Sequence, residues 1–134
     1  MRNHRRTRLL LTTAAITASF TAPVLAAASP AFASGGGGVS SSAACTGGGH
    51  FKLKAKHDDG KIEVEYQVDS NRAGQVWAVR ITDNGAVVVS RHATTAQPSG
   101  SFTIRKHIAN RPGPDKIHAR ATFKNHTCGG TVTL

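Results

Sequence analysis

Histidines and carboxylates are the side chains in this sequence best suited to chemistry. Residues 34–134 contain six histidines and all seven acidic residues of the chain. Neutral imidazoles beside carboxylates can hold zinc or copper. If successive strands alternate in direction, one pole of the domain gathers three histidines and four aspartates: His57, His107, His118, Asp58, Asp59, Asp83 and Asp115. That pole is the candidate location for a metal ion.

The spacing of these residues argues against a metal site. No HxH or HExxH motif places two ligands on one element. His118 occupies the outward register of its strand beside Lys116 and Arg120, whose positive charges disfavour a bound cation. We therefore assign no metal and no other cofactor. A metal-binding protein or metalloenzyme that uses His57, His107 and His118 is the alternative.

No segment carries a signature of catalysis. The sequence has no GxSxG nucleophile elbow, and the serines between residues 34 and 42 lie in a segment with little apolar surface. The glycine-rich segment 46–50 precedes an expected strand rather than a helix, so it is no phosphate-binding loop. We expect a protein that is not an enzyme.

The first 33 residues predict export. Four arginines lie within the first eight residues, an apolar stretch follows, and small residues end in Ala31-Phe32-Ala33. This order is typical of a secretory signal peptide, so we expect cleavage after Ala33 and a secreted protein. Pro23 and scattered Ser and Thr argue against stable membrane insertion. Residues 34–44 are predicted to be a flexible Gly/Ser spacer, and residues 45–134 the folded domain.

The charge balance suggests an anionic partner. Removing residues 1–33 takes away four of the 17 Lys and Arg residues and none of the seven acids, which leaves a net charge of +6. Such a surface attracts polyanions, among them cell-wall polymers, anionic lipid headgroups and nucleic acid outside the cell. Lys52, Lys54 and Lys56 line up on the outward side of one expected strand and are the candidate polyanion-binding residues. A surface that serves only solubility is the competing explanation, and no intracellular nucleic acid is expected.

The two cysteines predict one disulfide. Cys45 precedes the first expected strand and Cys128 follows the sixth, so alternating strands bring both to the same pole. A loop of this length would stabilise the fold by roughly 4 kcal/mol in the chain-entropy treatment. We expect a structural bond, because a redox pair or zinc site needs closer or more numerous ligands.

Apolar residues alternate with polar ones from residue 50 onward, which is typical of half-buried strands. Seven strands are expected, and they cover residues 51–56, 61–68, 75–82, 86–92, 101–106, 116–123 and 131–134. The Asn84-Gly85 pair between two of them predicts a tight hairpin turn. Seven short strands with turns at this interval favour an all-β, antiparallel, immunoglobulin-like sandwich with Trp77 in its core. A closed barrel is the alternative fold.

The segments "EYQVDSNRAGQVW" (65–77) and "PSGSFTIRK" (98–106), with the Ala-rich leader and Gly/Ser spacer, carry a resemblance. The chain resembles small secreted immunoglobulin-like β-sandwich proteins of high-GC Gram-positive bacteria, most of them without an assigned function. The apoproteins of enediyne chromoproteins are similar in size and expected fold. They are acidic with two disulfides, whereas this chain is basic with one, so no site residue is carried over.

These observations predict a secreted, basic, non-catalytic binding module with a cell-surface or extracellular partner, such as a cell-wall polymer or another polyanion. Besides the metal-binding alternative, a small-ligand carrier that resembles the chromoprotein apoproteins is the third hypothesis. It would need an apolar cleft between the sheets.

Overall fold

The computed structural model describes residues 37–134, which form eight strands and no helix. The strands are β1 (Val39–Ala44), β2 (His50–Asp58), β3 (Lys61–Asp69), β4 (Val76–Asp83), β5 (Ala86–Thr94), β6 (Ser101–Ala109), β7 (Lys116–Phe123) and β8 (His126–Thr133). The all-β prediction is confirmed. The predicted signal peptide, residues 1–33, and the first residues of the predicted spacer lie outside the described residues.

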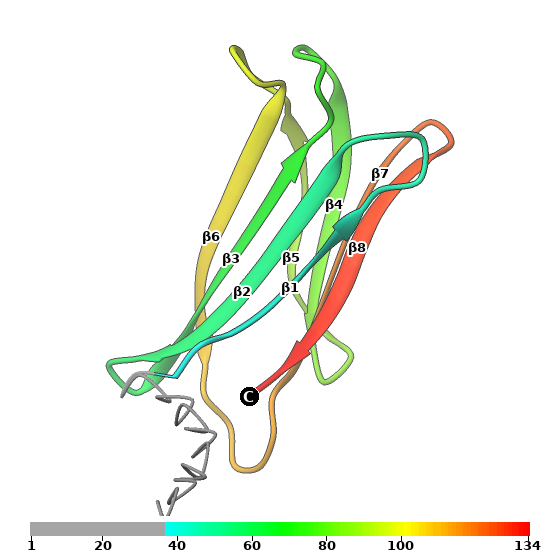
Figure 1. Cartoon of the computed structure of the whole chain (residues 1–134). Helices are drawn as coiled ribbons and strands as arrows, with labels where there is room; N and C mark the ends of the chain where they lie inside the picture. The colour runs from blue at the N-terminus through cyan, green and yellow to red at the C-terminus, as the bar shows by residue number, and fades with distance from the viewer. Residues whose placement is uncertain (1–36) are drawn as a thin grey trace, which may run out of the picture. The chain divides into compact units, whose positions relative to one another are not determined.

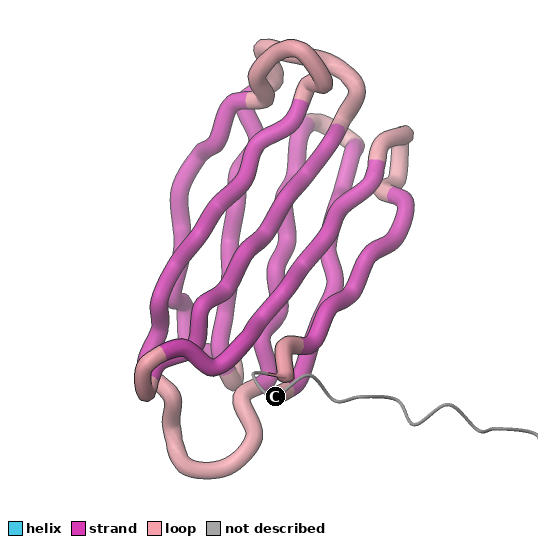
Figure 2. The backbone as a smooth tube through the Cα atoms, turned by 60° about the vertical axis from the view of Figure 1, so that its left-hand side comes forward, coloured by secondary structure: helices cyan, strands magenta, loops and turns pink. Residues whose placement is uncertain are grey.

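The eight strands form two antiparallel sheets of four, with the orders β1-β2-β3-β6 and β5-β4-β7-β8. The two sheets lie face to face as the layers of a sandwich (Figures 1 and 2). Hairpins join strands within a sheet, and the chain crosses between sheets after β3, β5 and β6. Because the strands divide into two separate sheets, the arrangement is a sandwich and not a closed barrel.

The prediction of seven strands is wrong by one, and the additional strand is β1. It lies within residues 34–44, the segment predicted to be a flexible spacer. All six of its residues pair with β2, from Val39 opposite Ala55 to Ala44 opposite His50. Backbone pairing needs no large side chains, so a serine-rich segment can form an edge strand without the apolar alternation that identifies the others.

The predicted alternation is confirmed on both sheets, because the inward positions are buried. The largest side chains without solvent exposure are Trp77 on β4 and Tyr66 on β3. Tyr66 packs beside Phe51 and Phe102, with ring centroids 6.3 and 6.4 Å apart. The Asn84-Gly85 turn has φ angles of 48° and 87°, which confirms the left-handed hairpin turn expected there.

Two bonds join the sheets at the edge formed by β1 and β8. The predicted disulfide is confirmed: Cys45 and Cys128 are bonded, with their Cα atoms 4.5 Å apart. The Tyr66 hydroxyl crosses the core and donates a 2.9 Å hydrogen bond to the Cys128 carbonyl. Burial raises the pKa of Tyr66, so the hydroxyl remains a donor at physiological pH. Both bonds hold the β8 backbone against the opposite sheet.

The other edge of the sandwich, formed by β5 and β6, carries charged side chains instead of a covalent bond. Arg91 on β5 pairs with Val79, and Lys106 on β6 pairs with Val64, so both occupy inward register positions. Both are nevertheless exposed. Inward-register charges on edge strands oppose the addition of a further strand from another molecule.

Removal of the disulfide should weaken the fold without changing it. The bond closes a loop between residues 83 positions apart. The double variant Cys45→Ser, Cys128→Ser should lose about 4 kcal/mol of unfolding free energy, because its unfolded chain is less restricted. Urea titration followed by tryptophan fluorescence measures this loss. A loss below about 1 kcal/mol would show that the bond contributes little beyond the surrounding contacts.

Candidate functional site

Two arginines lie on neighbouring strands on the outer side of the β5-β4-β7-β8 sheet. Arg80 on β4 and Arg120 on β7 are direct cross-strand partners, and Ser90 on β5 is the partner of Arg80 on its other side. The alternation that buries Val79 and Ala121 forces both arginines outward. We call this outer surface of β5-β4-β7-β8 the arginine face.

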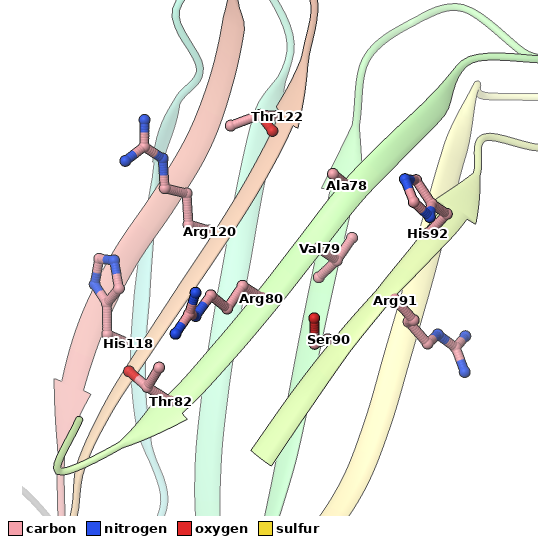
Figure 3. A pocket seen from close by; sticks show the side chains of 10 residues that line it. All are labelled: Ala78, Val79, Arg80, Thr82, Ser90, Arg91, His92, His118, Arg120 and Thr122. Atoms are coloured by element: carbon pink, nitrogen blue, oxygen red, sulfur yellow. The ribbon is translucent and has the colours of Figure 1, made fainter. Parts of the chain in front are cut away.

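A shallow groove of about 590 Å³ lies on the arginine face (Figure 3). The small side chains of Ala78 and Ser90 lie between the longer side chains of Arg80, Arg120 and His92. Thr82, Thr122 and His118 also line the groove. Hydroxyls, imidazoles and guanidinium groups are all donors to oxygen anions, so the lining suits an anionic ligand.

The arginine face has no acidic side chain. Of the seven acids in the chain, five lie on β2, on β3 or in the turn between them: Asp58, Asp59, Glu63, Glu65 and Asp69. Asp83 and Asp115 are buried, with 2% and 1% exposure. Within residues 37–134, neither Arg80 nor Arg120 makes an ion pair or a side-chain hydrogen bond. Their charges are therefore not neutralised by the protein.

The predicted lysine site lies on the opposite outer face of the sandwich and is partly neutralised. Lys52, Lys54 and Lys56 are exposed on β2, as expected. In register, Lys54 pairs with Glu65 and Lys56 with Glu63 on the neighbouring strand. Lys56 Nζ is 3.7 Å from Glu63 Oε1. This surface therefore alternates in sign, whereas the arginine face has no acidic side chain.

The structure separates the three predicted metal-ligand histidines. His107 lies on the outer face of the β1-β2-β3-β6 sheet, whereas His118 lies on the arginine face with Nδ1 2.9 Å from the Thr131 hydroxyl. His57 contacts Asn110, with 3.4 Å between its Nδ1 and the amide nitrogen. The three histidines share a pole of the domain but do not converge on one point.

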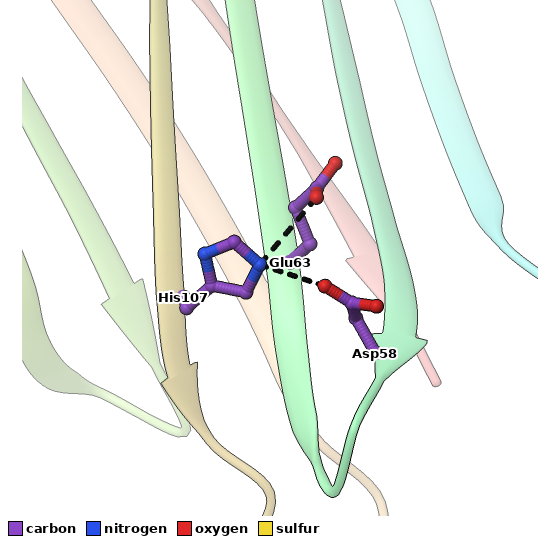
Figure 4. Close-up of side chains that lie close together, drawn as sticks. All are labelled: Asp58, Glu63 and His107. Carbon is purple, nitrogen blue, oxygen red and sulfur yellow. Dashed lines mark hydrogen bonds and ion pairs between the residues drawn. The ribbon is translucent and has the colours of Figure 1, made fainter.

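His107 instead converges with two carboxylates (Figure 4). Its Nε2 is 2.8 Å from Asp58 Oδ2 and 3.5 Å from Glu63 Oε2. These three ligand atoms lie within 4.8 Å of one another. Asp58 belongs to the predicted pole, whereas Glu63 is not among the residues assigned to it.

Asp83 and Asp115 form a buried carboxyl pair at the same pole. The Oδ1 atom of each is buried without a hydrogen-bond partner among the described residues. Burial, with the neighbouring Asp115 as the next cause, raises the pKa of Asp83, while Arg111 acts in the opposite direction. Because the pair is almost closed to solvent, it affects stability and is not positioned to act on a substrate.

Sequence reasoning missed the arginine pair. The alternation in residues 75–82 and 116–123 already places Arg80 and Arg120 outward. Their proximity depends on β4 lying beside β7, and on the register that sets them opposite each other. A sequence pattern does not supply that pairing, since 39 residues separate these two arginines in the chain.

No family model matches the chain, and no curated protein or solved structure matches it significantly. Across residues 37–134, no helix has the length and apolar character needed to cross a bilayer. The arginine face is therefore interpreted from its own residues and geometry.

The buried carboxyl pair predicts a distinctive pH dependence of stability. The pKa of Asp83 is higher in the folded protein than in the unfolded chain. At pH values between these two pKa values, the folded protein therefore binds more protons than the unfolded chain. Unfolding free energy should therefore fall as the pH rises through this window. Asp83→Asn cannot ionise, so this variant should have a higher Tm than the native protein at pH 7, with the difference narrowing toward pH 4.

The control for this measurement is Asp59→Asn, at an exposed turn position with a φ of 46° that Asn tolerates. Its Tm should follow that of the native protein at every pH. Thermal unfolding by circular dichroism between pH 4 and pH 7 measures all three proteins. An Asp83→Asn variant that is less stable than the native protein at pH 7 would contradict the buried-pair explanation.

Proposed function

We propose that this protein is a secreted, non-catalytic β-sandwich that binds an extracellular polyanion through its arginine face. The observation that carries the proposal is the pairing of Arg80 with Arg120 on a surface without acidic side chains. The excess of positive charge in residues 34–134 supports it, since such a surface draws anionic polymers from a distance.

The arginine pair opposes folding in the absence of a ligand. Like charges directly opposite each other on neighbouring strands are destabilising, by the same order as favourable pairs are stabilising. Other cross-strand pairs in this protein avoid that arrangement, since Arg105 Nε is 2.9 Å from Glu65 Oε2. An anion between Arg80 and Arg120 would remove the repulsion and accept hydrogen bonds from both guanidinium groups.

The geometry of β7 favours an extended polymer over a single small anion. Lys116, His118 and Arg120 occupy three successive outward positions on this strand. Alternate residues of a strand are roughly 7 Å apart, so these side chains form a line of donors along the sheet. Arg80 on β4 widens the line at one end. A chain of phosphate or sulfate groups could contact several of these side chains at once.

A small-ligand carrier, one of the alternative functions, has less support. Such a carrier needs an apolar cleft between the sheets, but Trp77, Tyr66 and Leu53 fill this region and have no solvent exposure.

We propose further that the sandwich is of the immunoglobulin-like type. This proposal is supported by the two packed antiparallel sheets and by the several connections that cross between them.

The proposed function predicts salt-sensitive retention on a polyanion. The double variant Arg80→Ala, Arg120→Ala should bind polyphosphate or heparin about tenfold or more weakly than the native protein, because each lost hydrogen bond to a charged group contributes about 1.5–3 kcal/mol. Affinity should be measured by calorimetry at about 50 mM NaCl and again at higher salt, where charge screening weakens it.

The matched control is Lys52→Ala, Lys54→Ala, which removes the same two positive charges from the opposite outer face. This variant should lose much less affinity than the arginine variant. Equal losses would mean that net charge alone determines binding, and would contradict a site on the arginine face. Absence of binding by the native protein at low salt would exclude the polyanion function.

The like charges of Arg80 and Arg120 also predict that a variant lacking one of them binds a polyanion more weakly but is more stable. Arg120→Gln should raise the unfolding free energy by about 0.2–1 kcal/mol at low salt. The gain should disappear near 1 M NaCl, where the Debye length is about 3 Å. Urea titrations at the two salt concentrations measure this effect.

For comparison, Arg105→Gln removes an arginine that is paired with Glu65, so it should leave stability unchanged or lower it slightly. If Arg120→Gln and Arg105→Gln shift stability in the same direction, repulsion between Arg80 and Arg120 is not significant.

A further inference from the structure

We infer that Asp58, Glu63 and His107 bind one divalent transition-metal ion, such as Zn²⁺, on the outer face of the β1-β2-β3-β6 sheet. The inference does not rest on the proposed function, because this cluster and the arginine face lie on opposite outer faces of the sandwich.

Three neighbouring strands supply the three side chains. Glu63 on β3 and His107 on β6 are direct cross-strand partners, so their side chains leave the sheet side by side. Asp58 is the last residue of β2, and the tight turn at Asp59-Gly60 sets it diagonally across from Glu63. The backbone of every ligand is thus held in a sheet ladder, which fixes the spacing of the site more firmly than loops would.

Only one of the two carboxylates can accept a good hydrogen bond from His107 at a time. Both carboxylates approach the same imidazole nitrogen, at 2.8 Å for Asp58 and 3.5 Å for Glu63. That nitrogen carries at most one hydrogen, so it can donate a good hydrogen bond to only one carboxylate at a time. Lys56 approaches the other oxygen of Glu63, Oε1, at 3.7 Å and leaves Oε2 facing the histidine. A metal ion between the three ligand atoms would interact with both carboxylates and the imidazole together.

The ligand types indicate the class of metal. An imidazole with two carboxylates suits zinc or a neighbouring transition metal, whereas calcium takes six to eight oxygens. Zinc binds His nitrogen at about 2.0–2.1 Å and carboxylate oxygen at about 2.0–2.2 Å, so small side-chain rotations would be enough to close the site. Three protein ligands leave a fourth position open for water or an external group.

Calorimetry with untagged, chelator-treated protein tests the site, with ZnCl₂ as the probe. The native protein should bind one equivalent of Zn²⁺. His107→Ala and Glu63→Gln should each weaken Zn²⁺ binding at least about tenfold. Even the loss of a group that only hydrogen-bonds to a metal ligand typically lowers metal affinity by that factor. Because binding favours the folded state, Zn²⁺ should raise the Tm of the native protein and leave the Tm of His107→Ala unchanged.

The matched control is His92→Ala, which removes an exposed strand histidine from the arginine face. It should bind Zn²⁺ as the native protein does. Less than a tenth of an equivalent bound by the native protein, or equal weakening in His92→Ala and His107→Ala, would overturn the inference. Equally tight binding of Ca²⁺ or Mg²⁺ would overturn the assignment to a transition metal. Loss of polyanion binding in the arginine variant would not affect any of these results.

Discussion

Side-chain alternation along paired strands determines both what this domain buries and what it displays. Once Trp77 and Tyr66 occupy the interior, every second neighbour on their strands must face solvent. Arg80 is displayed because Val79 and Ile81 are buried, and Glu63 because Ile62 and Val64 are buried. Register then decides which exposed groups become neighbours. A shift of one residue between β4 and β7 would remove the arginine pair, and a shift between β3 and β6 would separate His107 from Glu63.

The cross-links at the β1–β8 edge keep the two sheets in a fixed relationship. The Cys45–Cys128 bond joins them covalently, and the Tyr66 hydroxyl reaches through the core to the carbonyl of the same Cys128. Gly130 lies close by on β8, where a side chain would meet the Phe51 ring at 2.7 Å. The close approach of the sheets here therefore depends on both these bonds and the absence of a side chain at Gly130.

Periodicity was sufficient to predict most of the interior, and it failed where pairing does not depend on large side chains. The inward positions of β3 and β4 follow directly from their alternation, and the disulfide follows from strand parity. β1 has no such pattern, since its serines contribute backbone bonds rather than apolar area. Strand order is the other missing information. It sets Arg120 opposite Arg80 and brings His107 to Glu63, whereas residues on shared poles, such as His57, His107 and His118, lie on different surfaces.

The exposed charges of Arg91 and Lys106 affect whether copies of this protein associate at high local concentration. Any polymer that collects many copies of this protein raises their local concentration, and open strand edges at high concentration tend to join into fibrous aggregates. A neighbouring copy that docked on β5 or β6 would have to desolvate one of these cations inside the new interface. The addition of a further strand at this side of the sandwich is therefore opposed even where many copies gather.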